Sequence, residues 1–242
     1  MGTSQSHSLK TTPQWSAAKK AMTSVIKDQR NSQKHAKLMA TFGAAVSDSL
    51  YRGGGNNHGR GSFGRAGSRA LSNVIQFISD VRSLGIGRTI DGLGLIQAER
   101  PQTPRELIRV LCGFTAKKTN ALHDDEAAVA AQDRLLSKVF EECDNLTDIE
   151  TLLQQADEDI IDAWIIEFEV EYIMEYMGGL FQSHIFDKNA NPDVVCNEIK
   201  QWLCSELNNR LADEIHHVNI FDQDGKNYID TLTARILDIW QQ

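Results

Sequence analysis

Residues 159–181 read DIIDAWIIEFEVEYIMEYMGGLF and form the most apolar stretch of the chain. Apolar side chains recur there at three- and four-residue steps, which is the spacing of one face of an α-helix. The middle of the stretch, residues 166–172, also alternates between apolar and acidic residues with period two, a pattern typical of a strand. Because helical patterns flank it on both sides, we expect a central helix, with a strand as the alternative.

Helical patterns continue in both directions from this stretch. The segment Asn191-Pro192-Asp193 opens a helix whose apolar stripe runs six turns, to Ile215. Upstream, Thr103-Pro104-Arg105-Glu106 combines a capping residue, Pro at the first helical position and Glu at the third. Further helices are predicted over 15–50, 70–84, 124–140 and 228–240, with shorter ones within 85–95 and 147–153. The sequence therefore predicts an all-α, multi-helix body.

Composition divides the chain into four parts. Residues 1–14 are expected to form a flexible N-terminal arm, because Leu9 is the sole large apolar residue between positions 3 and 12. A basic helical segment should follow over 15–51, and a linker over 52–69 contains seven glycines with interspersed arginines. The remaining residues, 70–242, are expected to form the helical body.

Charge is distributed very unevenly. Residues 1–118 carry 18 Lys or Arg and 6 Asp or Glu, a net charge of +12. Residues 119–242 carry 7 Lys or Arg and 27 Asp or Glu, a net charge of −20. Halves this different either fold against each other or bind partners of opposite sign, and the sequence leaves both open.

The totals favour a cytoplasmic protein. No apolar run approaches the roughly 20 residues of a membrane span, and the N-terminus lacks the apolar core of a secretory signal. The four cysteines contain no CxxC pair, so we expect reduced thiols.

The Gly/Arg linker is the first candidate for binding. It could contact nucleic acid or an acidic partner through arginines at four positions: Arg52, Arg60, Arg65 and Arg69. Phe63 is its sole aromatic residue, and it contains no Lys for a phosphate-binding P-loop. A linker with an electrostatic role is the simpler interpretation.

Metal and catalytic signatures are not recognisable. A calcium loop with Gly225 at its sixth position would place Ile220 first and Thr231 last, where carboxylates are needed. His216 and His217 are adjacent on a helix, point about 100° apart and do not suit one ion. We therefore expect no metal, no cofactor and no enzymatic activity.

The N-terminus carries two patterns. Gly2 with Ser6 matches the short myristoylation motif, and Lys10, Lys19 and Lys20 could supply a basic second signal for a membrane anchor. Because residue 2 is small, removal of Met1 would also leave an unhindered α-amine.

Four short motifs together resemble a known family. They are Met1-Gly2-Thr3-Ser4, Pro13-Gln14-Trp15, Gly64-Arg65-Ala66-Gly67-Ser68-Arg69-Ala70 running into a helix, and Gly92-Leu93-Gly94-Leu95. In order and type they are similar to the B component of the bacterial Qat antiphage defence systems (QatB). The resemblance covers roughly the first half of the chain, and the acidic half matches in being helical.

The resemblance implies a protein that works with partners. In such systems the B component acts beside an ATPase (QatA), a QueC-like enzyme (QatC) and a TatD-like nuclease (QatD). QueC-like enzymes activate a carboxyl-deazaguanine with ATP and pass it to an amine. The resemblance thus implies that Gly2 is modified on its α-amine, with recognition by the residues that follow it, Thr3, Ser4, Gln5 and Ser6. The expected function is a non-catalytic subunit, and a nucleic-acid-binding adaptor is the alternative.

Overall fold

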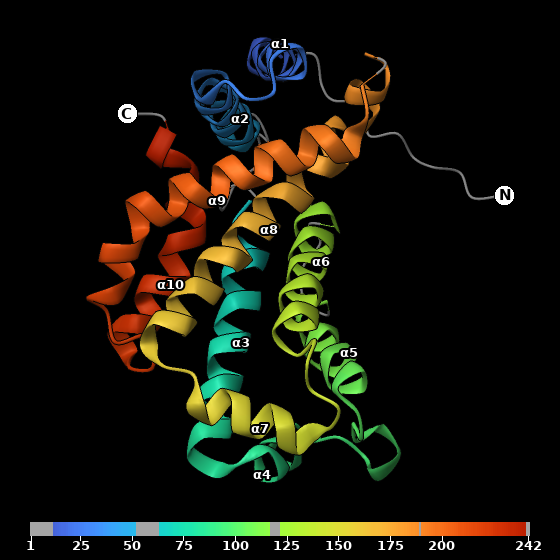
Figure 1. Ribbon diagram of the computed structural model, residues 1–242, viewed down its shortest axis with the longest axis vertical. Coiled ribbons are helices and arrows are strands. Elements are labelled where there is room, and N and C mark those ends of the chain that lie inside the picture. The colour runs from blue at the N-terminus through green and yellow to red at the C-terminus, as the bar shows by residue number, and fades with distance from the viewer. Residues whose placement is uncertain (1–11, 52–62, 117–121, 189, 241–242) are drawn as a thin grey trace, which may run out of the picture.

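Helix α8 (Glu158–Phe186) runs through the middle of this computed structural model, which describes residues 12–51, 63–116, 122–188 and 190–240 (Figure 1). With 29 residues it is about 43 Å long. Its buried side chains lie on all sides, as expected for a helix that is apolar around its circumference. The helix predicted here is confirmed, and the alternating 166–172 segment does not form a strand.

The other helices surround α8. Along the chain they are α1 (Pro13–Lys27), α2 (Ser32–Tyr51), α3 (Arg65–Leu84), α4 (Ile86–Gly92), η1 (Gln97–Glu99), α5 (Pro104–Thr115), α6 (Leu122–Val139), α7 (Leu146–Gln155), α9 (Pro192–His216), α10 (Gln223–Arg235) and η2 (Ile236–Trp240). Helices α6 and α9 make the most extensive contacts with α8, and α1 and α3 also touch it. The described ranges contain no strand, so the predicted all-α class is confirmed.

Side-chain caps fix several helix starts where the sequence predicts them. The Glu106 N–H donates to Thr103 Oγ1 at 3.3 Å, and the Glu106 carboxylate accepts from the Gln102 N–H at 2.8 Å. At the start of α9 the Asp193 N–H donates to Asn191 Oδ1 at 3.0 Å. Asp222, which a calcium loop would use as a ligand, instead caps α10 by accepting from the Gly225 N–H at 2.9 Å.

The starts of α1, α3 and α10 differ from the expected ones. Helix α10 begins at Gln223 rather than at 228, because Asp222 caps it there. Helix α1 begins at Pro13, within the stretch predicted as arm, because Thr12 caps it by accepting from the Trp15 N–H at 3.3 Å. Helix α3 begins at Arg65 rather than after Arg69, because Gly64 turns the chain with φ +89° and other helices accept its first N–H groups. The rest of the predicted arm and linker, 1–11 and 52–62, lies outside the described residues.

The basic and acidic halves fold against each other. One hydrophobic core extends from Trp15 in α1 to Trp240 in η2. Helix α3 packs on α6 and α10, and α2 packs on η2 and α9 (Figure 1). Ion pairs also join the halves, at Arg69–Asp125 and Arg30–Glu198. Because Arg30 is almost fully exposed and its pair spans 4.0 Å, apolar burial contributes more to this packing than charge does.

An aromatic cluster attaches the α1–α2 hairpin to α8. The Trp15 ring lies 6.3 Å from the rings of both Phe42 in α2 and Phe181 in α8. Phe42 in turn lies 6.3 Å from Phe63, the residue that precedes the turn into α3. Aromatic pairs at these separations are favourable beyond the area they bury, so the cluster fixes α1 on the core.

Among the described helices, none combines the length and the apolar content needed to span a lipid bilayer.

Replacing Trp15 with alanine should destabilise the protein by about 3–5 kcal/mol, because the side chain is 8% exposed and its loss opens a cavity beside Phe42 and Phe181. Phe186→Ala is the matched control, since Phe186 is 72% exposed and its loss should change stability by less than about 0.5 kcal/mol. Urea unfolding followed by far-UV circular dichroism measures both. Equal losses in the two variants would contradict the anchoring role of Trp15.

Candidate functional site at the start of helix α3

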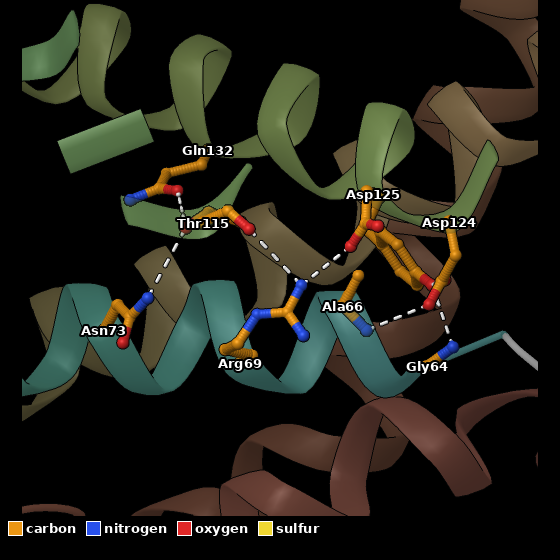
Figure 2. Close-up of polar contacts among 9 residues, drawn as sticks. Gly64, Ala66, Arg69, Asn73, Thr115, Asp124, Asp125 and Gln132 are labelled. Atoms are coloured by element: carbon orange, nitrogen blue, oxygen red, sulfur yellow. Dashed lines mark hydrogen bonds and ion pairs between the residues drawn. The ribbon is translucent and has the colours of Figure 1, made fainter. Parts of the chain in front are cut away.

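Several of the buried polar side chains of the described residues gather around the start of α3. Its first residues come from the motif at 64–70, and Gly64, the N-cap residue, has no side chain with which to accept an N–H group. The Ala66 N–H donates instead to Asp124 Oδ2 at 2.9 Å, from helix α6 (Figure 2). The Gly64 N–H donates to the Tyr172 hydroxyl at 2.8 Å, from helix α8. Two other helices therefore cap α3.

The two capping groups also bind each other. The Tyr172 hydroxyl donates to Asp124 Oδ1, so a continuous chain of hydrogen bonds links α3, α8 and α6. Burial raises the pKa of Asp124, and the hydrogen bonds from Tyr172 and Ala66 oppose that rise. Burial, together with the neighbouring Asp124 carboxylate, raises the pKa of Tyr172 well above its ordinary value. The tyrosine thus remains a neutral hydroxyl that can donate.

A second polar set continues one turn further along α3. Arg69 Nη2 donates to Asp125 Oδ1 at 2.7 Å and to the Thr115 carbonyl oxygen at 3.3 Å (Figure 2). Thr115 Oγ1 donates to Gln132 Oε1 at 2.6 Å, and Asn73 Nδ2 lies 3.5 Å from the same hydroxyl. These contacts join α3 to the end of α5 and to α6, so Arg69 binds within the protein.

Helix α10 approaches the same turn of α3 from the opposite side. A Cβ atom on Gly67 would lie 2.7 Å from Thr233 Cγ2 and 2.9 Å from the Tyr172 ring. Ser68 Oγ donates to the backbone carbonyl oxygen of Asp230 at 3.0 Å, and Ser72 Oγ donates to the Asp230 carboxylate, also at 3.0 Å. Gly67 is thus the residue that permits α3, α8 and α10 to meet.

A buried carboxyl group lies in this contact region. Glu169 is fully buried, and Thr233 Oγ1 donates to its Oε1. Its second oxygen has no hydrogen-bond partner among the described residues. Burial raises the pKa of Glu169 to about 8, opposed by the hydrogen bond from Thr233. The group is therefore mainly protonated at neutral pH.

The accessible surface beside this interior is a groove of about 720 Å³ between α3 and α10. Its lining includes Arg65, Ser72, Gln76, Phe221, Asp222 and Lys226. Asp124 and Tyr172 are 1% and 0% exposed, so their acid–base chemistry is not available to a substrate in this conformation. The groove presents charged and polar side chains to solvent, whereas the hydrogen-bonded interior holds the helices together.

A second groove, of about 740 Å³, lies between α5 and α6 and contains Cys112. Burial raises the pKa of the Cys112 thiol to about 12, so it stays protonated and is a weak nucleophile at neutral pH. All four cysteines are free thiols, in keeping with the absence of CxxC pairs.

Of the arginines proposed from the sequence, two can be placed. Arg65 is exposed at the rim of the α3–α10 groove, and Arg69 is engaged by Asp125. The other predicted site residues lie outside the described ranges: Gly2, Thr3, Ser4, Gln5, Ser6, Arg52 and Arg60. Sequence reasoning missed Tyr172 and Glu169, although the period-two alternation around them was a sign that α8 carries polar groups on a buried face.

Replacing Gly67 with alanine should destabilise the protein by about 1–3 kcal/mol, because the added methyl group overlaps Thr233 and Tyr172. Gly113→Ala is the control, since Gly113 is also helical but a Cβ there has no neighbour within 4 Å. The control should be neutral or stabilising by up to about 1 kcal/mol. Thermal and urea unfolding give both values; a tolerated Gly67→Ala would show that the three helices do not meet as closely as described.

Glu169 should make stability fall as pH rises. Below pH 4.5 the carboxyl group is protonated in both states, and between that pH and about 8 the unfolded chain ionises while the folded one does not. The free energy of unfolding should thus decrease by up to a few kcal/mol across this window and stop decreasing above it. Glu169→Gln should remove this part of the pH dependence in urea unfolding measured from pH 4.5 to 9. Parallel profiles for the two proteins would argue against a protonated Glu169.

Comparisons with protein-family models, with curated proteins and with solved structures find no match to this chain. A functional assignment therefore depends on the quoted motifs and on the geometry of the described residues.

Proposed function

We propose that this chain is a non-catalytic subunit of a bacterial antiphage defence complex of the Qat type, and that a QueC-like partner modifies Gly2. The resemblance carried by the motifs at 1–4, 13–15, 64–70 and 92–95 suggests this role. The ATPase and the TatD-like nuclease of such systems are its further proposed partners, and the cytoplasm is its proposed compartment.

The observation that carries the proposal is the anchoring of the chain directly after the arm. Thr12 caps α1, and Trp15 is buried between Phe42 and Phe181. Ten residue steps separate Gly2 from Thr12, which limits the reach of the α-amine to about 35 Å from the folded body. That reach is enough to enter a deep site on a partner while the helical body stays outside it.

The proposed reaction forms an amide. The partner transfers AMP from ATP to the carboxyl group of a carboxyl-deazaguanine and releases pyrophosphate. The neutral α-amine of Gly2 then attacks the activated acyl carbon, a C–N bond forms, AMP leaves and the amine loses a proton. This chain supplies the amine alone, which requires removal of Met1. Small and polar residues at positions 2–6 suit an extended segment in a groove.

The alternative is an adaptor that contacts nucleic acid through Arg52, Arg60, Arg65 and Arg69. The two of these arginines that the structure describes, Arg65 and Arg69, give it less support. The Arg69 guanidinium would have to leave Asp125, 2.7 Å away, before it could reach a phosphate. Arg65 is exposed and shares its groove with Lys226, but Asp222 and Asp230 line the same groove. The local charge is therefore mixed rather than strongly basic.

Mass spectrometry of the intact protein and of its N-terminal peptide tests the proposal. Protein produced with its genomic neighbours should carry an adduct of deazaguanine size on Gly2, and protein produced alone should not. Gly2→Ala should fold normally yet impair defence, and an uncleaved N-terminal tag should do the same, whereas the same tag at the C-terminus is the matched control.

Full defence with a blocked N-terminus would refute the proposal. An adduct with the mass of a myristoyl group would instead show that Gly2 carries a membrane anchor.

A further inference from the structure

Three metal-ligating side chains meet where α8 begins and α9 ends. Asp159 and Asp162 are three residues apart in α8 and so lie on one face of its start. His216 is the last residue of α9. Its Nδ1 atom lies 3.4 Å from Asp159 Oδ1 and 3.5 Å from Asp162 Oδ2, and the three ligand atoms lie within 4.8 Å of one another.

These separations fit a shared ion better than direct bonds. Charge-assisted N–H···O hydrogen bonds span about 2.7–2.9 Å, which is shorter than either distance here. Two ligand atoms on a tetrahedral Zn²⁺ with bonds of about 2.1 Å lie about 3.4 Å apart. The imidazole nitrogen is thus at ligand-to-ligand distance from both carboxylates. Asp159, whose side chain is 83% exposed, is free to bring its carboxylate oxygen to the same ligand-to-ligand distance from Asp162.

The surroundings favour a cation. The Asp162 side chain is 13% exposed, and two further acidic residues, Glu158 and Asp159, precede it in the first turn of α8. The negative end of the α9 dipole lies at His216, while Asp157 caps the positive end of α8 by accepting from the Ile160 N–H at 2.9 Å.

A small hollow adjoins the cluster. It has a volume of about 10 Å³, near the minimum for one water molecule, and is lined by Glu158, Asp162, His216 and residues 218–221. A fourth ligand can therefore come from a water in this hollow or from Glu158.

We propose that Asp159, Asp162 and His216 bind a divalent zinc-type metal ion in four-coordinate geometry. The ion would join the start of α8 to the end of α9, at the open end of the hairpin that these two helices form. Asp162 and His216, which it connects, are 54 positions apart in the sequence. His217, adjacent in sequence, is not among the side chains whose ligand atoms lie within 4.8 Å of one another.

Zinc titration of the full-length protein tests this site. The protein is prepared without a polyhistidine tag, stripped with EDTA, dialysed and titrated with ZnCl₂ in a calorimeter. We expect one zinc ion per chain and a zinc-dependent rise in the melting temperature. Asp162→Asn and His216→Gln should each weaken binding by about tenfold or more. His217→Gln, the matched control one residue away, should bind as the wild type does.

A second measurement separates a metal site from a simple ion pair. Co²⁺ in place of Zn²⁺ should give the visible absorption of a tetrahedral complex in the wild type and in His217→Gln, but not in His216→Gln. If His216→Gln, folded by circular dichroism, binds zinc like the wild type, the proposal is overturned. A folded wild type whose melting temperature zinc does not change overturns it as well, because the three side chains then act as an ion pair alone.

Discussion

Helix α3 has a glycine, Gly64, as its N-cap residue and depends on two other helices to accept its first N–H groups. Asp124 and Tyr172 accept these groups and bind each other, so the position of α3 is coupled to those of α6 and α8. Burying a carboxyl group without partners would cost several kcal/mol, and its hydrogen bonds to the Ala66 N–H and the tyrosine offset that cost. Gly67 then lets α10 pack on the same turn, because it leaves room for Thr233.

The same logic extends along α8. A helix that is apolar on all sides can pack in many rotational settings, since hydrophobic contact is not directional. The polar groups on its buried faces remove that freedom: Tyr172 pairs with α6, Glu169 with Thr233 of α10, and Glu171 with Lys200 of α9 and Arg134 of α6. All of these pairings form together at a single rotational setting of α8 about its axis. The buried polar groups therefore select one arrangement of a core whose burial supplies most of the stability.

Local chemistry made much of the fold predictable. The caps at Thr103 and Asn191 depend on residues within three positions of the helix start, and the structure confirms both. The start of α3 was not predictable, because its capping group Asp124 lies 58 residues away from Ala66. Period-two spacing in 166–172 reflects polar groups directed at different helices, which a sequence pattern cannot distinguish from a strand. The cluster of Asp159, Asp162 and His216 was not predictable from the sequence either, since two helices bring these residues together.

The distribution of polar groups also bears on how partners can bind. Asp124, Glu169 and Tyr172 are almost inaccessible and engaged in holding helices, so a partner that reached them would have to open the core. Recognition without unfolding must use exposed groups such as Arg65 and Lys226 along the α3–α10 groove, or residues outside the described ranges. The proposed modification of Gly2 meets this requirement, because residue 2 precedes the cap of α1 at Thr12 and a reaction there breaks no contact of the Trp15 cluster. Under that proposal, a partner's chemistry acts on the chain while the core keeps its single arrangement.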